Sequence, residues 1–186
     1  MLTLASRSPQ RRAILTQLGV EFRVEPADVE EIGEGDPRAV VVDNALRKAR
    51  AVAGERVLGV DTEVVLDGVV YGKAGDEHEA RRHLSRLSGR EHEVWSGIAL
   101  RSEARGEQTA AAVTLVRFRT LEEDWIDWYL ATGEWRERAG AYAIQGLGSS
   151  LVERVEGDFW NVVGLPVYEL VRLAPDLVLH AQGGQG

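Results

Sequence analysis

Short apolar runs and helix-initiation signals alternate from the start of the chain, and this alternation restricts the fold more than any other feature. The run 1–5 predicts a strand, and the segment 9–18 has the apolar spacing of a helix. Ser8 is a natural N-cap for this helix, and the proline after it fits the first helical position. The pair Asp36-Pro37 repeats this signal ahead of a longer helix that reaches about residue 53.

The rest of the chain continues this mixture of strands and helices. An Asp-Gly pair at 67–68 predicts an antiparallel hairpin between the strands 57–65 and 69–71. Further strands are expected at 93–101, 109–119 and 151–155, and further helices at 76–89, 120–132 and 166–173. The pattern predicts an α/β fold with a mixed sheet. We expect one domain over 1–180 and a flexible tail at 181–186, because typical domains have about 100–200 residues.

Charge and composition exclude several function classes. The net charge is −8, from 22 basic and 30 acidic residues, which argues against a broad basic surface that would hold nucleic acid. The chain has no cysteine, so disulfides, thiolate zinc sites and cysteine catalysis are excluded. No apolar run has the length of a membrane span and no signal peptide is recognisable, so we expect a cytoplasmic protein without a membrane partner.

Lysine is rare in this chain, which has 20 arginines but only Lys48 and Lys73. The compact charge of lysine suits phosphate or carboxylate contacts in a tight site. The alternative is that both are chance lysines on a solvated surface.

The segment Ser6-Arg7-Ser8-Pro9-Gln10-Arg11-Arg12 carries the strongest local signal. The free N–H groups and positive dipole at a helix start favour an anion. Cations at this end do not stabilise the helix, so their presence there indicates function. We interpret Ser8, Arg11 and the helix start as a phosphate cradle; the alternative is a serine cap with exposed arginines.

Asp61 is expected at the end of an apolar strand, where sites gather in α/β folds. Its carboxylate suits metal coordination or general-base work, and Glu30 or Glu31 could add a second carboxylate. Mg²⁺ commonly takes one or two protein carboxylates plus substrate phosphates. The alternatives are a turn cap at Asp61 and a solvated acidic loop at the two glutamates.

Two further polar residues stand in suggestive places. The hairpin could fold Lys73 back towards Asp61. Gln145 lies among small residues and could read a base edge, although the segment 140–146 could also be a tight strand entry. The histidine spacing, the lack of a Gly-x-Ser-x-Gly elbow and the lack of a Walker sequence argue against zinc, serine-hydrolase and P-loop chemistry. Four aromatic residues, Trp125, Trp128, Tyr129 and Trp135, favour core packing or a dimer contact.

Eight segments in unbroken order resemble the Maf family of nucleoside triphosphate pyrophosphatases. They are LASRSPQRRAIL at 4–15, VEE at 29–31, ALRKA at 45–49, VLGVDTEVVLDG at 57–68, GK at 72–73, LSGREHEV at 87–94, AGAYAIQG at 139–146 and GDFWNVVGLPVYEL at 157–170. The resemblance implies an elongated mixed sheet flanked by helices with a deep central cleft, as in inosine triphosphate pyrophosphatases. It implies hydrolysis of a nucleoside triphosphate to the monophosphate and pyrophosphate with a divalent cation, Mg²⁺ or Mn²⁺.

The resemblance also implies roles for individual residues. Asp61 matches the proposed proton acceptor of the family. Ser8 and Arg11 match its Ser-x-x-Arg motif, and both lysines match charged cleft positions, as does Glu31. We therefore expect the metal at Glu31 and Asp61.

Base preference follows from three further positions. Thr62 and Gln145 match the dTTP/UTP type of the family, whereas Gln10 stands where that type usually has arginine. A different class of function stays open, namely a nucleotide-binding regulator of cell division with little catalysis. A third is an enzyme for modified nucleotides. A homodimer is expected at the family level, and no stable nucleic-acid complex is expected.

Overall fold

The computed structural model describes residues 1–179, and the predicted tail at 181–186 lies outside these residues. The strands are β1 (Leu2–Leu4), β2 (Phe22–Val24), β3 (Arg56–Leu66), β4 (Val69–Tyr71), β5 (Glu91–Ser102), β6 (Gly106–Phe118) and β7 (Val152–Glu156). The helices are α1 (Pro9–Gln17), α2 (Pro37–Ala51), α3 (Glu77–Leu87), α4 (Glu123–Thr132), the 3-10 helix η1 (Leu147–Leu151), α5 (Phe159–Val163), α6 (Val167–Leu173) and α7 (Asp176–Leu179).

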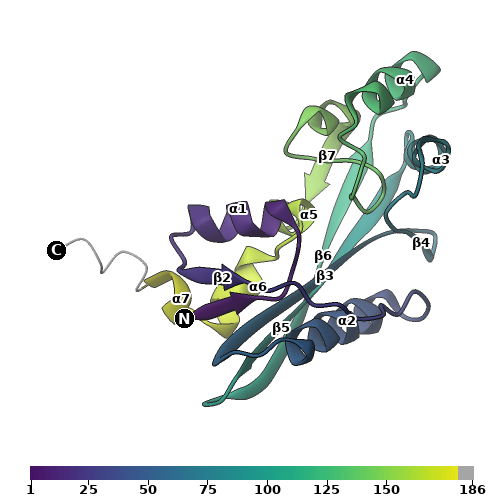
Figure 1. Cartoon of the computed structure of the whole chain (residues 1–186). Coiled ribbons are helices and arrows are strands. Elements are labelled where there is room, and N and C mark those ends of the chain that lie inside the picture. Colours follow the sequence, from purple (N-terminus) through teal and green to yellow (C-terminus); the bar gives the residue numbers. More distant parts are fainter. Residues whose placement is uncertain (180–186) are drawn as a thin grey trace. The chain divides into compact units, whose positions relative to one another are not determined.

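The strands pair in the order β2-β1-β3-β5-β6-β7, and β4 pairs with β3 (Figure 1). β1 runs parallel to both of its neighbours, with Leu4 opposite Val24 on one side and Leu58 on the other. β4 and β7 run antiparallel to their partners. The sheet is therefore mixed, and the predicted α/β class is confirmed.

Most predicted elements are present within one to three residues of their expected ends. The hairpin at 67–68 is confirmed, with Asp67 and Gly68 both at positive φ, as this turn requires. Helices were not foreseen at η1, α5 and α7. α5 has only five residues, which are too few to show helical periodicity. The helix expected from residue 120 begins at Glu123, and Glu122 precedes it without a side-chain cap hydrogen bond.

The chain forms two compact units. The first comprises Met1–Thr62, Ser96–Ala112 and the described residues from Gly164 on; the second comprises Glu63–Trp95 and Val113–Val163. The single domain over 1–180, the elongated shape and the central cleft all stay predictions.

In the first unit, α2 packs unusually close to the strands beneath it. A Cβ on Gly59 would lie 2.0 Å from the carbonyl oxygen of Ala45, and a Cβ on Gly97 would lie 2.0 Å from that of Val41. Only glycine permits this approach of helix backbone to strand backbone. The fully buried side chains of Ala45 and Ala49 face the sheet here. This close packing fixes the distance between β3 and the polar side chains of α2.

The second unit has an aromatic core around His92. The imidazole packs edge-on against Phe118 and Tyr142, and its Nε2 lies 3.0 Å from the hydroxyl of Tyr142. Of the four aromatic residues predicted to serve the core or a dimer contact, Tyr129 and Trp135 are buried in this core, whereas Trp128 is 41% exposed.

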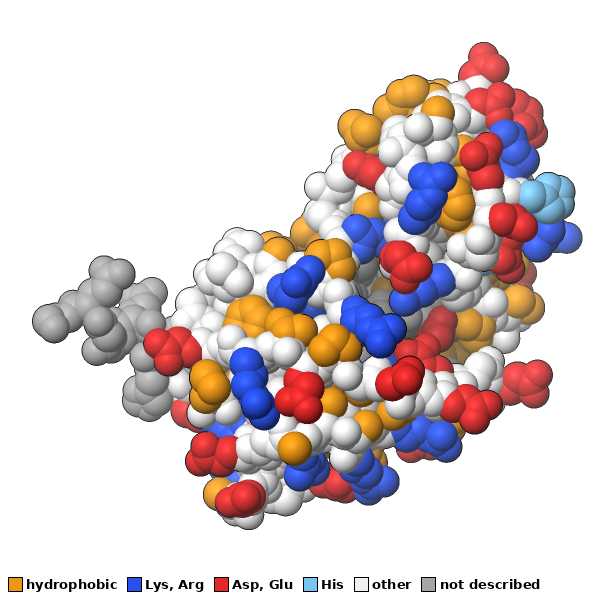
Figure 2. Space-filling model, in the orientation of Figure 1, with side chains coloured by type: hydrophobic (Ala, Val, Ile, Leu, Met, Phe, Trp, Pro, Cys, Tyr) orange, Lys and Arg blue, Asp and Glu red, His pale blue; other side chains and the backbone are white. Residues whose placement is uncertain are grey.

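The surface carries both signs of charge, and Figure 2 shows acidic and basic side chains interspersed over one face. Within residues 1–179, no helix combines the length and apolarity needed to cross a membrane.

Candidate active site

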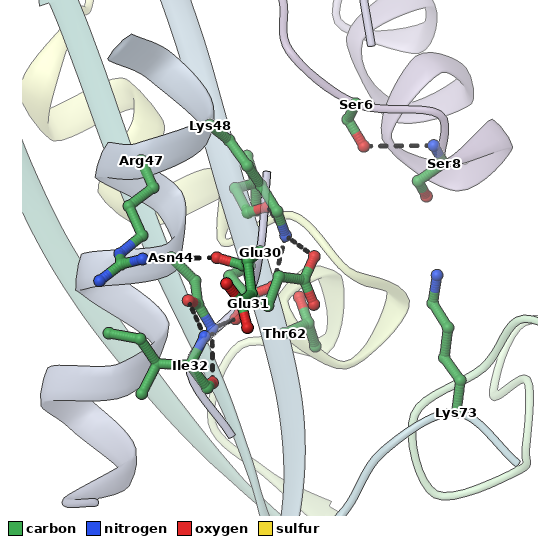
Figure 3. Close-up of polar contacts among 12 residues, drawn as sticks. Ser6, Ser8, Glu30, Glu31, Ile32, Asn44, Arg47, Lys48, Thr62 and Lys73 are labelled. Atoms are coloured by element: carbon green, nitrogen blue, oxygen red, sulfur yellow. Dashed lines mark hydrogen bonds and ion pairs between the residues drawn. The ribbon is translucent and has the colours of Figure 1, made fainter. Parts of the chain in front are cut away.

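Lys48 joins the two carboxylates that were predicted to act together. Its Nζ lies 2.6 Å from Oδ1 of Asp61 and 2.7 Å from Oε1 of Glu31 (Figure 3). It also donates a 3.4 Å hydrogen bond to the carbonyl of Val60. Lys48 is buried, so the alternative of a chance surface lysine is wrong at this position.

Asp61 is 4% exposed, yet it lies in the middle of β3 rather than at the end of a strand. The correction has a simple cause: the apolar pattern continues through Val64 to Leu66, where β3 pairs with β4. A buried carboxylate is stable only when it is paired and hydrogen-bonded. Lys48 supplies the opposite charge. The alternative of a turn cap at Asp61 is wrong, because Asp61 lies within β3 rather than in a turn.

Asn44 holds the other oxygen of Asp61. Its Nδ2 donates to Oδ2 of Asp61 at 3.0 Å and to the carbonyl of Ile32 at 3.0 Å. Its Oδ1 accepts a 2.7 Å hydrogen bond from the N–H of Ile32. The acidic loop that carries Glu31 is thereby tied to α2, while Glu30 is exposed and accepts through its backbone carbonyl from Arg47.

Ser8 caps α1 as predicted. Its Oγ accepts a 3.4 Å hydrogen bond from the N–H of Arg11 and lies 3.2 Å from Oε1 of Gln10, to which it donates. The alternative of exposed arginines holds for Arg12 but is wrong for Arg11, which is 9% exposed.

The guanidinium of Arg11 is bound on all three nitrogens. It donates to the carbonyl of Gly164 at 2.9 Å, to Oγ of Ser6 at 3.0 Å and to Oγ1 of Thr62 at 3.2 Å. Burial lowers the pKa of Arg11 from its ordinary value, and the nearby carboxylates of Asp61 and Glu31 act in the opposite direction. Arg11 therefore fixes the start of α1 to β3 at the residue next to Asp61.

Two predicted residues belong to the second unit. The side chain of Lys73 is 64% exposed, and its Nζ lies 3.1 Å from Oε2 of Glu137, itself 81% exposed. Gln145 is exposed and lies just before η1. The expectation that the hairpin brings Lys73 back to Asp61 stays a prediction, as does the role of Gln145.

Hydrogen bonds to Glu134 and Tyr129 anchor the backbone of the loop that carries Gln145. Glu134 accepts hydrogen bonds from the N–H groups of Leu147 at 3.0 Å and Gly148 at 3.1 Å. The hydroxyl of Tyr129 accepts a 2.9 Å hydrogen bond from the N–H of Ala143. These contacts order the segment without using the side chain of Gln145.

Sequence reasoning gave no individual role to three polar residues of the first unit: Ser6, Asn44 and Ser96. Asn44 had a usable signal, because it lies four residues before Lys48 on the same helix face and interrupts an apolar stripe. Ser96 is fully buried, and its Oγ lies 2.9 Å from Oγ1 of Thr62. Its place in a long apolar strand gave no comparable signal.

The donor set suits a hard divalent cation. Glu31 and Asp61 both contact one ammonium group, so two carboxylate oxygens already converge on a positive charge. Within residues 1–179 no group of three or more histidine, aspartate or glutamate side chains could hold a metal. Mg²⁺ commonly binds one or two carboxylates together with substrate phosphates, so this pair fits it.

Comparison with known proteins decides the family. The family described as Maf-like protein matches residues 1–177. The chain belongs to the Maf family. Three curated relatives of this Maf protein bear the name dTTP/UTP pyrophosphatase. The one from Anaeromyxobacter sp. (strain Fw109-5) is 51% identical and covers 92% of this chain and 87% of its own.

The other two relatives are less similar in sequence. The relative from Symbiobacterium thermophilum is 46% identical and covers 92% of this chain and 91% of its own. The relative from Pyrococcus furiosus is 42% identical and covers 92% and 93%. Among solved structures, a nucleoside-triphosphatase / dITP/XTP pyrophosphatase from Mycobacterium abscessus gives a TM-score of 0.48 at 17% identity, covering 100% of this chain and 98% of its own.

Proposed function

We propose that this Maf protein is a nucleoside triphosphate pyrophosphatase that converts dTTP and UTP to the monophosphate and pyrophosphate. The observation that carries the proposal is the buried Asp61 carboxylate, bound by Lys48 and Asn44 and adjoining Arg11 through Thr62. The names of the relatives, at 42–51% identity over nearly the whole chain, support the same activity.

The reaction is attack of water on the α-phosphorus. The water oxygen bonds to phosphorus, the bond to the bridging oxygen breaks, and pyrophosphate leaves. Asp61 orients this water and accepts its proton. Among residues 1–179, each carboxylate oxygen of Asp61 accepts from one side-chain donor, which leaves a second acceptor direction for water.

Cationic and hydroxyl groups hold the triphosphate. Ser8 and the start of α1 offer donors, and the charges of Arg11, Lys48 and Lys73 offset those of the phosphates. Such groups act mainly by positioning and by electrostatic stabilisation of developing charge. The protein contacts of Arg11 keep its charge in place without substrate, so ordering it costs nothing on binding.

Glu31 and Asp61 would hold the divalent cation, Mg²⁺ or Mn²⁺. When bound, the cation neutralises phosphate charge and polarises the phosphoryl oxygens. Glu31 is suited to this task because its side chain is half exposed and lies on a loop anchored through Ile32.

Base recognition falls to Thr62 and Gln145, with Gln10 as a further contact. The amide of Gln145 can both donate to and accept from a pyrimidine edge. Thr62 is held by Arg11 and Ser96, so its methyl group and hydroxyl present one fixed orientation. A homodimer and a cytoplasmic location remain predictions for this chain.

The test is pyrophosphate release with Mg²⁺ or Mn²⁺ across the natural NTPs, dNTPs and 7-methyl-GTP. We expect release from dTTP and UTP above all others. Release from another nucleotide would contradict the base assignment while keeping the chemistry. Nucleotide binding without release from any of them would contradict the enzyme and favour the regulator of cell division.

A further inference from the structure

Asn44 and Lys48 lie one helical turn apart on α2, and each contacts both the acidic loop and Asp61. Lys48 makes these contacts through its charge, and Asn44 makes them through one amide (Figure 3). The two side chains therefore connect the acidic loop to Asp61 at two points. Lys48 binds Oδ1 of Asp61 and the Glu31 side chain; Asn44 binds Oδ2 of Asp61 and the backbone of Ile32.

Asn44 is fully buried, and its side-chain amide makes its hydrogen bonds to residues of the candidate site. Both its donor contacts and its acceptor contact go to Ile32 or Asp61, at 2.7–3.0 Å. A buried asparagine that served only the fold could satisfy its polar atoms with any nearby donor or acceptor. Here the partners are the predicted base and the backbone next to a predicted metal ligand.

The close packing of α2 makes this geometry rigid. The helix backbone rests directly on Gly59 and Gly97, so Asn44 cannot shift away from β3 without opening that packing. One short amide thus fixes both the orientation of the Asp61 carboxylate and the distance between the acidic loop and β3.

We infer that Asn44 is a positioning residue for catalysis, which aligns Asp61 and holds the Glu31 loop against it. This inference rests on the proposed function, because Asn44 acts through Asp61. Partners that orient ligating or catalytic carboxylates typically contribute about 10–100-fold to activity. We expect that loss in kcat for Asn44→Ala, with a smaller change in KM.

A double-mutant cycle separates positioning from a general structural role. Asn44→Ala should lower kcat in the wild-type background but cost less than about twofold when added to Asp61→Asn, measured in single turnovers with excess enzyme. Equal losses in both backgrounds would overturn this inference alone. Wild-type turnover of Asp61→Asn would overturn the proposed role of Asp61, and the inference with it.

Asn44→Asp keeps the proposal testable if the alanine variant does not fold. The new carboxylate can still accept from the N–H of Ile32 but cannot donate to Asp61. We expect hydrogen exchange at the Ile32 amide to stay slow in this variant while kcat falls about 10–100-fold. Wild-type kcat would overturn the inference.

Asn161 provides a matched control in the second unit. It is also fully buried, and its Nδ2 donates to the carbonyl of Val94 and to Thr114. Asn161→Ala should lower stability without changing exchange at Ile32 or the kcat of the folded fraction. A kcat loss in this control equal to that of Asn44→Ala would overturn the inference.

Discussion

The two lysines of the chain match charged motif positions alike, yet their surroundings differ sharply. Lys48, in the first unit, is buried between two carboxylates and donates to a backbone carbonyl. Lys73, in the second, is mostly exposed and pairs with a glutamate that is more exposed still. Lys48 belongs to a polar network that stands complete without substrate. Lys73 is mostly exposed, so in the proposed function it would lose conformational freedom on binding the triphosphate.

The same contrast extends to the other site residues. Asp61, Arg11 and Thr62 are held by two or more hydrogen bonds each. Gln145 is exposed on a loop whose backbone, rather than its side chain, is anchored. In the proposed function, the phosphate chemistry therefore falls to fixed groups, whereas base selection is shared between the fixed Thr62 and the exposed Gln145.

The largest expected effect follows from removing the buried cation. Lys48→Met leaves Asp61 buried without its charge partner, which should lower the free energy of unfolding by about 3–5 kcal/mol. It should also lower kcat by about 10²-fold or more. Lys73→Met, the matched variant, should raise KM and leave stability nearly unchanged. Denaturant titration and steady-state kinetics of both variants test this, and equal stability losses would break the comparison.

The next largest effect is expected from the addition of a methyl group beneath α2. In Gly59→Ala the new Cβ would meet the carbonyl oxygen of Ala45 at 2.0 Å, so the helix that carries Lys48 must move. We expect a loss of about 3 kcal/mol in unfolding free energy, together with reduced kcat. Gly33→Ala is the control, because nothing lies within 4 Å of its Cβ. Wild-type stability of Gly59→Ala, measured by thermal denaturation, would show that α2 does not depend on this contact.

Acid should weaken the second unit through His92. Burial lowers the pKa of His92 from 6.5 to about 4, so the folded state keeps the imidazole neutral while the unfolded chain takes up a proton. This contribution to stability is complete above about pH 6.5 and is lost as pH falls towards 4. It amounts to about 2 kcal/mol between pH 7 and pH 5. His92→Gln should remove this part of the pH dependence, measured by urea denaturation; an unchanged slope would contradict the assignment.

The smallest effect is expected at the anchor of the Gln145 loop. Glu134→Ala removes the acceptor of two backbone N–H groups and should cost about 1 kcal/mol in stability. Release of the loop should reduce the ratio of turnover of dTTP and UTP to turnover of other nucleotides. The kcat for the best substrate should stay near wild type. Competition between nucleotides measures this ratio. A large fall in kcat with unchanged selectivity would show that the loop serves the chemistry instead.

Sequence periodicity and caps were sufficient for most of the fold. The Ser8 cap, the hairpin at 67–68 and the long helix after Pro37 rely on local backbone chemistry, and all are present. η1 and α5 are too short to leave a periodic signal. Strand order could not be predicted from the sequence, because pairing between distant segments depends on tertiary packing.

Candidate site residues could be predicted where charge stands out against its surroundings. Lysine is rare in this chain, which distinguishes Lys48, and Asp61 is a carboxylate within an apolar strand. Neutral hydrogen-bonding residues such as Asn44 and Ser96 look like many others in a sequence. Their importance arises from burial beside Asp61 and Thr62, which only the folded chain reveals.

The central claim is that Asp61 is the base that activates water, and one substitution tests it most directly. Asp61→Asn keeps the size of the side chain and can still accept from Lys48, but it cannot take up the proton. We predict that nucleotide affinity, measured by calorimetry, stays within a few-fold while pyrophosphate release falls about 10²–10⁴-fold. Near-wild-type turnover with unchanged binding would contradict the account.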